Sequence, residues 1–371
     1  MRVILVGGGT AGHVNPAIAL AEYIKKQDPN NRILYIGAKN GMEKDLVTQA
    51  GFEFKDITIS GFSRKLNLKS IKKNLITLKN IFISSLESRK ILKEFKPDIC
   101  IGTGGYVTGP FLQQAHNLKI PFIIHDSNSF PGVTTKILAK KANKVLVINN
   151  RAKKYLKNSN NILTTGTPVR ENIINYSKID QKTAREKLNI NNNLPVILSF
   201  GGSLGSEIIN NLMLEIMQKN NNFNIIHGYG KNNSKFFKKL DNNILNNPKY
   251  IIKEYINNMP ECLAAADLVI CRAGATSISE IQATCKPSIL IPSPNVAENH
   301  QYYNALELKD NNCASLIQEK ELNYNILLTE TNRILNTNLK QEYIKNLRKI
   351  SDVNINSSVE IYDLIKNILN K

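Results

Sequence analysis

The sequence has few cysteines and no pattern that would pair them. Its 371 residues contain Cys100, Cys262, Cys271, Cys285 and Cys313. None belongs to a Cys-x-x-Cys pair, and an odd number cannot all be paired within one chain. We therefore expect neither a disulfide framework nor a zinc site, and a reducing compartment.

Long hydrophobic runs are also lacking at the start of the chain. The opening Met-Arg-Val-Ile-Leu-Val reaches glycine after only four apolar residues. A signal peptide or a membrane-spanning helix needs a far longer apolar stretch. Any contact with a membrane is therefore expected from the side.

Acidic residues are scarce in one half of the chain. Residues 1–165 hold 26 Lys and Arg against 10 Asp and Glu, whereas residues 166–371 hold 23 against 20. A general coding bias toward Asn, Lys and Ile explains part of the net charge of +19 but not this asymmetry. The first half is expected to attract polyanions: nucleic acid, anionic lipid headgroups or phosphorylated substrates.

Short apolar runs alternate with helical patterns along the chain, which predicts an α/β protein with parallel sheets. The pattern restarts after Pro168, so two tandem doubly wound, Rossmann-like domains are expected, over residues 1–165 and 166–340, with the helices of 341–371 packing back on the first domain. Strands are expected at Val3–Val6, Ile33–Ile36, Ile99–Ile101, Phe122–Ile124, Val145–Ile148, Val196–Phe200, Asn224–His227, Leu268–Cys271 and Ser288–Ile291.

Glycine-rich turns follow the first strand of each predicted domain. Residues 7–12 fit Gly-x-Gly-x-x-Gly and precede a helix, a combination that favours an anion, although a tight turn without ligand has the same pattern. Residues 201–206 form a similar turn. The second strand ends in Gly37-Ala38-Lys39 and lacks the acidic residue that would hold an NAD ribose.

A third turn, residues 272–280, leaves two interpretations open. Ser277 and Glu280 have the spacing of a capping box, in which Glu280 would satisfy a backbone donor. Alternatively, Glu280 accepts from ribose hydroxyls while the helix N-terminus faces a diphosphate. Glycine turns in both domains predict a ligand in the cleft between them, with a nucleotide diphosphate on one half and an acceptor on the other.

Seven motifs in a fixed order resemble those of the MurG family of bacterial glycosyltransferases, and the resemblance covers nearly the whole chain. The motifs are Gly-Gly-Thr-Ala-Gly-His-Val-Asn-Pro-Ala at 8–17, Gly-Thr-Gly-Gly-Tyr-Val-Thr-Gly-Pro at 102–110, His-Asp-Ser-Asn at 125–128, Gly-Thr-Pro-Val-Arg at 166–170, Gly-Gly-Ser-Leu-Gly at 201–205, Arg-Ala-Gly-Ala at 272–275 and Asn-His-Gln-Tyr-Tyr-Asn-Ala at 299–305.

The resemblance implies a B-type glycosyltransferase fold and a defined reaction. GlcNAc would pass from UDP-GlcNAc to the MurNAc C4 hydroxyl of lipid I, undecaprenyl-pyrophosphoryl-MurNAc-pentapeptide, with inversion, giving lipid II for peptidoglycan synthesis. The donor would bind the C-terminal domain and the acceptor the N-terminal one. No metal or other cofactor is implied, in keeping with a sequence that has no Asp-x-Asp motif.

The resemblance also assigns substrate-binding residues by position. Arg170 and Ser203 would lie near the diphosphate, the backbone of Ile256 at the uracil, and Glu280 at the ribose. Ala275, Thr276 and Ser277 would face the phosphates at a helix N-terminus, and Gln301 and Asn304 the sugar hydroxyls. Thr10, Ala11, Gly12 and Asn128 would approach the sugar from the N-terminal side.

Three residues are candidates for the catalytic base. His13 follows the first glycine turn, where it either caps the helix or deprotonates the acceptor hydroxyl, a task that suits the ordinary histidine pKa of about 6.5. His125 and Asp126 are the alternatives. Family members more often have Glu and Gln where this chain has Asp126 and Ser127, so the acidic position carries over less directly.

A basic, amphipathic stretch lies within the first half. Residues 62–96 contain ten Lys and Arg, two Glu, and apolar residues largely at helical spacing. The common explanation is a surface helix with its apolar side on the core. With a lipid-linked acceptor, we expect instead that residues 62–82 dock peripherally on the anionic cytoplasmic face of the cell membrane.

Two other functions compete with glycosyl transfer. A UDP-GlcNAc epimerase of the same fold would use the donor site alone, but would need additional carboxylates in the cleft. A nucleic-acid-binding protein would use the basic first half, yet that half lacks the interleaved aromatic and basic residues of single-strand binders. We therefore expect no nucleic-acid partner.

Overall fold

The structure is a computed structural model that describes residues 1–61, 68–156, 160–219, 222–231 and 233–370, with the backbone alone for 68–76 and 78. The chain forms two compact units. Unit 1 comprises residues 1–170 and 356–371, and unit 2 comprises residues 171–355. The chain thus leaves unit 1 once and returns to it for its last helix.

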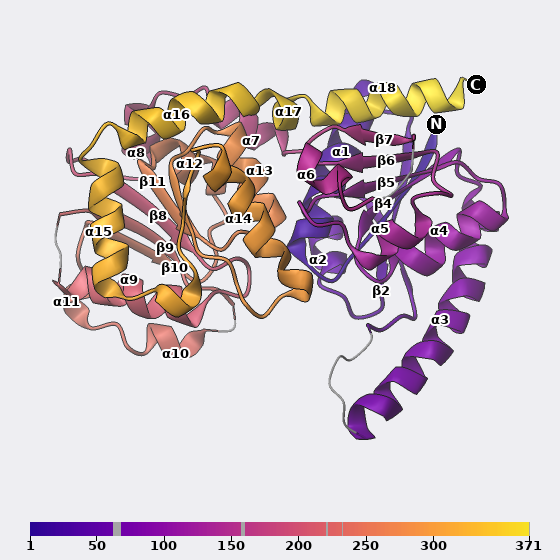
Figure 1. The fold of residues 1–371 in the computed structure, drawn as a ribbon, viewed down its shortest axis with the longest axis horizontal. Coiled ribbons are helices and arrows are strands. Elements are labelled where there is room, and N and C mark those ends of the chain that lie inside the picture. The colour runs from indigo at the N-terminus through magenta and orange to yellow at the C-terminus, as the bar shows by residue number, and fades with distance from the viewer. Residues whose placement is uncertain (62–67, 157–159, 220–221, 232, 371) are drawn as a thin grey trace. The chain divides into compact units, whose positions relative to one another are not determined.

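Unit 1 is built on a seven-stranded parallel sheet of order β3-β2-β1-β4-β5-β6-β7 (Figure 1). The strand order reverses between β1 and β4, which makes that pair the switch point of the sheet. The strands are β1 Arg2–Gly7, β2 Arg32–Ala38, β3 Glu53–Ile57, β4 Ile99–Gly104, β5 Phe122–Asp126, β6 Lys144–Val147 and β7 Ile162–Thr164. The helices are α1 Ala11–Gln27, α2 Glu43–Gln49, α3 Leu68–Phe95, α4 Thr108–Asn117, α5 Val133–Leu138, α6 Asn150–Lys153 and, from the chain end, α18 Ser357–Leu369.

Helices cover both faces of this sheet because its strands are apolar on both faces. On one face, Val3 and Leu5 pack against α1 and, from α18, Ile361 and Ile365. On the other face, alternate strand residues pack with α3 and α4. This sandwich buries the central strands and leaves the turns at their carboxyl ends as the place where a ligand can approach.

Unit 2 repeats the plan with a six-stranded parallel sheet of order β10-β9-β8-β11-β12-β13, whose switch point lies between β8 and β11. Its strands are β8 Val196–Phe200, β9 Asn224–Gly228, β10 Tyr250–Lys253, β11 Leu268–Cys271, β12 Ser288–Leu290 and β13 Ser315–Leu316. Its helices are α7 Glu171–Tyr176, α8 Gln181–Lys187, α9 Glu207–Lys219, α10 Ser234–Phe237, α11 Asn242–Leu245, α12 Met259–Ala265, α13 Ala275–Ala283, α14 His300–Asp310, α15 Tyr324–Leu335, α16 Leu339–Ile350 and α17 Asp352–Ile355, with the 3₁₀ turns η1 Ala297–Asn299 and η2 Glu319–Glu321.

The predicted fold class, two doubly wound α/β domains, is confirmed by these two sheets. All nine expected strands occur, and β3, β7, β10 and β13 are additional strands at the four sheet edges. Of the closing helices, α16 and α17 belong to unit 2, whereas α18 packs on α1 in unit 1. Within the described residues, no helix is both long and apolar enough to cross a membrane.

Candidate functional site

Two glycine turns meet at the switch point of unit 1. The turn after β1, residues 7–10, and the turn after β4, residues 104–107, are joined by a hydrogen bond from Gly8 N–H to the Gly104 carbonyl, 3.2 Å. Gly105 has a φ of +84°, and a Cβ there would lie 2.3 Å from the Gly8 carbonyl oxygen. Only glycine permits this approach, so the sequence itself brings the two turns together.

His13 lies on the first turn of α1 and is held from the neighbouring strand. Its Nδ1 lies 3.1 Å from the Thr103 carbonyl oxygen, and Thr103 Oγ1 donates to the His13 carbonyl, 2.7 Å. A carbonyl only accepts, so Nδ1 carries the proton, and the neutral ring keeps its lone pair on Nε2. His13 is half-buried, and Gly9 and Thr10 beside it are exposed. This arrangement suits a general base.

His125 and Asp126, at the end of β5, are both buried and engaged. His125 Nε2 lies 2.8 Å from the Gly166 carbonyl oxygen, Nδ1 lies 3.3 Å from Ser127 Oγ, and burial lowers the pKa of the ring. Asp126 accepts hydrogen bonds from Asn128 N–H, Gly132 N–H and Thr135 Oγ1, between 2.7 and 3.1 Å. Through these hydrogen bonds, both residues hold the loop after β5 in its conformation.

The segment that ends unit 1 runs from the expected boundary at 166–168 into α7. Gly166 has a φ of +66° and supplies the carbonyl that His125 contacts. Arg170 is half-buried and is the last residue of unit 1. Arg170, which is predicted to contact the diphosphate, therefore lies at the end of unit 1, one residue before unit 2 begins.

The turn after β8 occupies the switch point of unit 2. Gly205 has a φ of +79°, and a Cβ there would lie 2.0 Å from the Tyr229 carbonyl oxygen. Gly205 N–H donates to the Gly202 carbonyl, 3.0 Å, and Lys231 N–H to the Ser203 carbonyl, 3.2 Å. The turn is thus fastened against the loop after β9, with Ser203 half-buried within it.

Helix α13 follows strand β11, the neighbour of β8 in the sheet. Its N-terminus is the second element of unit 2 that is predicted to contact phosphate. Its N-cap residue is Gly274, which has no side chain to cap the helix. Ser277 lies inside the first turn, so the capping-box interpretation of Ser277 and Glu280 is wrong. Ala275, Thr276 and Ser277 supply the first-turn backbone N–H groups, which lack acceptors within the helix.

The remaining predicted donor residues come from one loop of unit 2 and from helix α14. Ile256, between β10 and α12, is buried, and a Cβ on Gly228 would lie 3.1 Å from its Cδ1. Gln301 Oε1 accepts from Ser293 N–H, 2.9 Å. Asn304 is buried and its Nδ2 donates to the Ala273 carbonyl, 3.2 Å, so it supports the turn that leads into α13.

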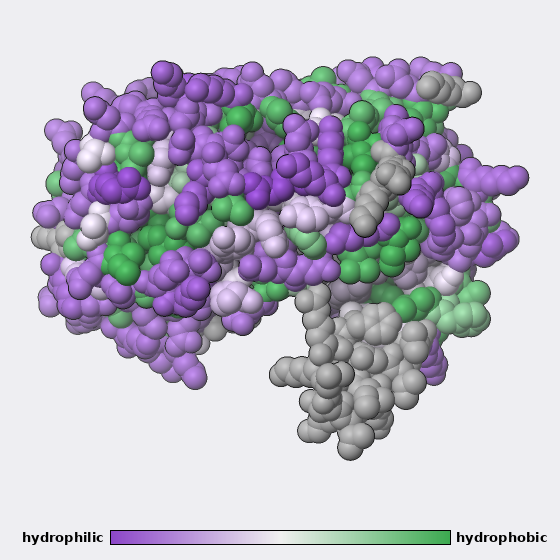
Figure 2. All heavy atoms as spheres, viewed as in Figure 1, coloured by the Kyte–Doolittle hydropathy of each residue, from purple (hydrophilic) through white to green (hydrophobic). Residues whose placement is uncertain are grey.

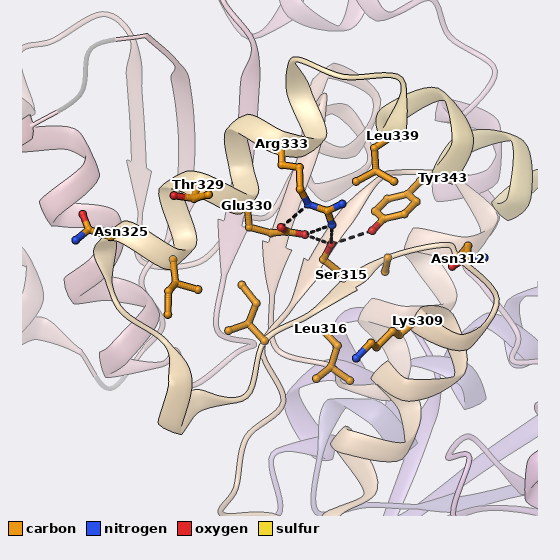
Figure 3. Close-up of a pocket in the computed structure, with 13 residues that line it drawn as sticks. Lys309, Asn312, Ser315, Leu316, Asn325, Thr329, Glu330, Arg333, Leu339 and Tyr343 are labelled. Atoms are coloured by element: carbon orange, nitrogen blue, oxygen red, sulfur yellow. Dashed lines mark hydrogen bonds and ion pairs between the residues drawn. The ribbon is translucent and has the colours of Figure 1, made fainter.

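A pocket of about 600 Å³ in unit 2 lies away from these turns, beside the edge strand β13 (Figure 3). Four of its polar side chains bond one another: Ser315 contacts Glu330 and Tyr343, and Arg333 forms two hydrogen bonds with Glu330, of 2.6 and 2.7 Å. None of the predicted site residues lines it. We do not place the donor there, because its lining includes neither the turn after β8 nor the N-terminus of α13.

Two residues that the sequence did not single out support the unit 1 turns. Thr103 lies in β4, directly before Gly104, within one of the motifs. Glu43 accepts a hydrogen bond from Gly9 N–H, 3.3 Å, although it is the first residue of helix α2. Nothing in its local sequence indicates that contact.

Family models describe both halves of the chain. The glycosyltransferase family 28 N-terminal domain matches residues 3–147, and the family 28 C-terminal domain matches residues 196–364. Two curated relatives carry the name UDP-N-acetylglucosamine–N-acetylmuramyl-(pentapeptide) pyrophosphoryl-undecaprenol N-acetylglucosamine transferase. The one from Acetivibrio thermocellus is 41% identical over 100% of this chain and 98% of its own length. The one from Thermoanaerobacter sp. is 40% identical over 99% of this chain and 100% of its own length.

Solved structures have the same fold. MurG from Acinetobacter baumannii matches with a TM-score of 0.74 at 24% identity, over 99% of both chains. UDP-GlcNAc 2-epimerase from Neisseria meningitidis matches with a TM-score of 0.64 at 16% identity, over 99% of this chain and 100% of that one. At these identities the likeness is one of fold, shared by a transferase and an epimerase.

Proposed function

Because the chain belongs to glycosyltransferase family 28 and to its MurG group, we propose that it transfers GlcNAc from UDP-GlcNAc to the MurNAc C4 hydroxyl of undecaprenyl-pyrophosphoryl-MurNAc-pentapeptide, forming lipid II. The observation that carries this proposal is the 41% identity, over the full length of both chains, to a transferase with that name. The glycine turns at the switch point of each unit support the proposal, because the carboxyl ends of parallel strands are where ligands bind in such sheets.

His13 is the general base in this proposal. Nδ1–H donates to the Thr103 carbonyl, so Nε2 takes the proton from the C4 hydroxyl. The C4 oxygen then bonds to the anomeric carbon of GlcNAc while the bond from that carbon to the diphosphate oxygen breaks. One displacement inverts the anomeric centre, and UDP leaves with the electron pair.

His125 and Asp126 position the loop after β5, including Asn128, rather than exchange a proton. His125 is only 1% exposed, and both ring nitrogens have partners. The Asp126 carboxylate already accepts three hydrogen bonds. Thr10, which is exposed, and the half-buried Ala11 and Gly12 approach the reacting sugars.

Unit 2 holds UDP-GlcNAc in this proposal. The N-terminus of α13, with Thr276 and Ser277, and the turn that contains Ser203 stabilise the charge that develops on the leaving diphosphate. Glu280, in α13, accepts from the ribose hydroxyls. Gln301 reaches the sugar, and Asn304 fixes the turn before α13.

Peripheral docking on the cytoplasmic face of the membrane is the second part of the proposal. The predicted docking residues 62–82 lie mostly outside the residues whose side chains the structure describes. The described end of α3 supports the idea: Phe82 and Leu86 are 68% and 57% exposed, and Lys79, Arg89 and Lys90 are exposed near them. Much of the remaining described surface in Figure 2 is hydrophilic.

Vesicle sedimentation tests the docking. The double variant Phe82→Ser, Leu86→Ser should lose binding to vesicles that contain phosphatidylglycerol, whereas Phe237→Ser, an exposed aromatic of unit 2, should bind like the parent. Binding that does not depend on anionic lipid would contradict docking. Nucleic acid is not a partner in this account, and any retention in a gel shift should vanish at modest salt.

The epimerase alternative shares the fold and makes a different prediction. An epimerase would convert UDP-GlcNAc without any acceptor, whereas a transferase releases one UDP for each acceptor glycosylated. Incubating the protein with UDP-GlcNAc alone, and then with a lipid I analogue, separates the two. Consumption of donor only in the second reaction supports transfer.

A further inference from the structure

Glu43 is a fully buried carboxylate behind the glycine turn of unit 1. It is the first residue of α2 and is 0% exposed. Among the residues that the structure describes, no lysine, arginine or histidine forms an ion pair with it. A buried charge is costly unless hydrogen bonds compensate it, so its partners indicate what it does.

Two backbone N–H groups donate to this carboxylate, and they come from different strands. Ala38 N–H, at the end of β2, donates to Oε1 at 2.7 Å, and Gly9 N–H, after β1, donates to Oε2 at 3.3 Å. Glu43 therefore ties the end of β2 to the turn that leads into α1. His13 lies on the first turn of that helix, four residues after Gly9.

Three glycines make room for the carboxylate. A Cβ on Gly8 or on Gly41 would lie 2.3 Å from Glu43 Oε1, and a Cβ on Gly37 would lie 2.4 Å from its Cγ. These glycines belong to the turn after β1, the end of β2 and the loop before α2. Gly8 is therefore needed for the close approach of Glu43 as well as for any approach of a ligand.

We propose that Glu43 is a positioning residue for the transfer reaction, one that holds Gly9 and thereby sets the conformation of residues 7–13. This inference rests on the proposed function, because it concerns the turn that presents His13 to the acceptor. A carboxylate only accepts, so it can serve two N–H donors at once. Glutamine has one accepting oxygen and would turn its NH₂ group toward one of those donors.

Glu43→Gln is the direct test because it keeps the size of the side chain and removes its second acceptor. We expect kcat/KM for a lipid I analogue to fall at least tenfold, while the Kd for UDP-GlcNAc, which unit 2 binds, changes less than twofold. Hydrogen exchange at residues 7–13 should become faster.

Asn31→Ala is the matched control. Asn31 is also buried in unit 1, where it bonds the Met1 amino group and the Ile24 carbonyl, each at 2.9 Å, before β2 and so at the opposite end of the strands. This variant should lose thermal stability but keep kcat, KM and the exchange rate of the turn. A general loss of stability would affect both variants alike.

Gly41→Ala displaces the carboxylate without altering the turn itself and should reproduce the defect of Glu43→Gln. An active parent with unchanged kcat/KM and unchanged exchange in both variants would overturn the role of Glu43. A parent that binds UDP-GlcNAc but transfers nothing would instead overturn the proposed function, and the exchange measurement would still report on the contact between Glu43 and Gly9.

Discussion

Replacing His13 by alanine separates its catalytic role from its structural one. The hydrogen bond from His13 to the Thr103 carbonyl is worth about 1 kcal/mol of stability. A positioned general base contributes about 10²- to 10⁴-fold, which is about 2.7 to 5.4 kcal/mol of the barrier. The variant should therefore fold and bind UDP-GlcNAc while kcat falls at least a hundredfold.

The assay measures UDP release with a lipid I analogue across a range of pH. Protonated imidazole cannot accept a proton, so the parent should lose kcat/KM on the acidic side, and His13→Ala should lack that dependence. His116→Ala, at an exposed histidine near the end of α4, is the control and should behave like the parent. A His13→Ala enzyme with kcat within tenfold of the parent would refute the assignment.

Three further predictions concern stability and the loops. Gly205→Ala forces a φ of +79° on alanine and sets its Cβ 2.0 Å from the Tyr229 carbonyl oxygen. The variant should lose about 2 kcal/mol or more of folding stability, measured by thermal melting, and should bind UDP more weakly, measured by calorimetry. An unchanged Tm would contradict the close approach. Asp126→Asn should lower Tm yet keep kcat within tenfold, and a hundredfold loss would restore Asp126 as a catalytic residue. Burial lowers the pKa of His227 to about 4, below the unfolded value of about 6.5. As the pH falls, the unfolded chain therefore binds the proton first, and unit 2 should lose folding stability on the order of 3 kcal/mol between pH 6.5 and 4. His227→Asn should flatten that slope in melts at several pH values, and an equal slope would contradict it.

The central strands were predictable because they are buried on both faces and read as continuous apolar runs. The edge strands were not. In β3, three of the five residues are charged, Glu53, Lys55 and Asp56, and β7 and β13 have three and two residues. An edge strand has one neighbour and an exposed side, so its sequence resembles that of a loop.

Sequence motifs located the turns of the candidate site but not the bonds between them. Glycines within 7–9 and 201–205 indicated tight turns after strands. The contact of His13 with Thr103 depends on β1 and β4 being neighbours, which the order of elements along the chain does not specify. The mistaken capping box at Ser277 arose because the helix starts earlier, at Ala275, with glycine as its N-cap.

Transfer of GlcNAc to a lipid-linked acceptor is tested most directly with labelled UDP-GlcNAc and vesicle-borne undecaprenyl-pyrophosphoryl-MurNAc-pentapeptide. Label should appear in the lipid product, β-linked to the MurNAc C4 oxygen, with one UDP released per sugar transferred. Intact UDP-GlcNAc bound by the protein without transfer, or donor epimerised in the absence of acceptor, would contradict it.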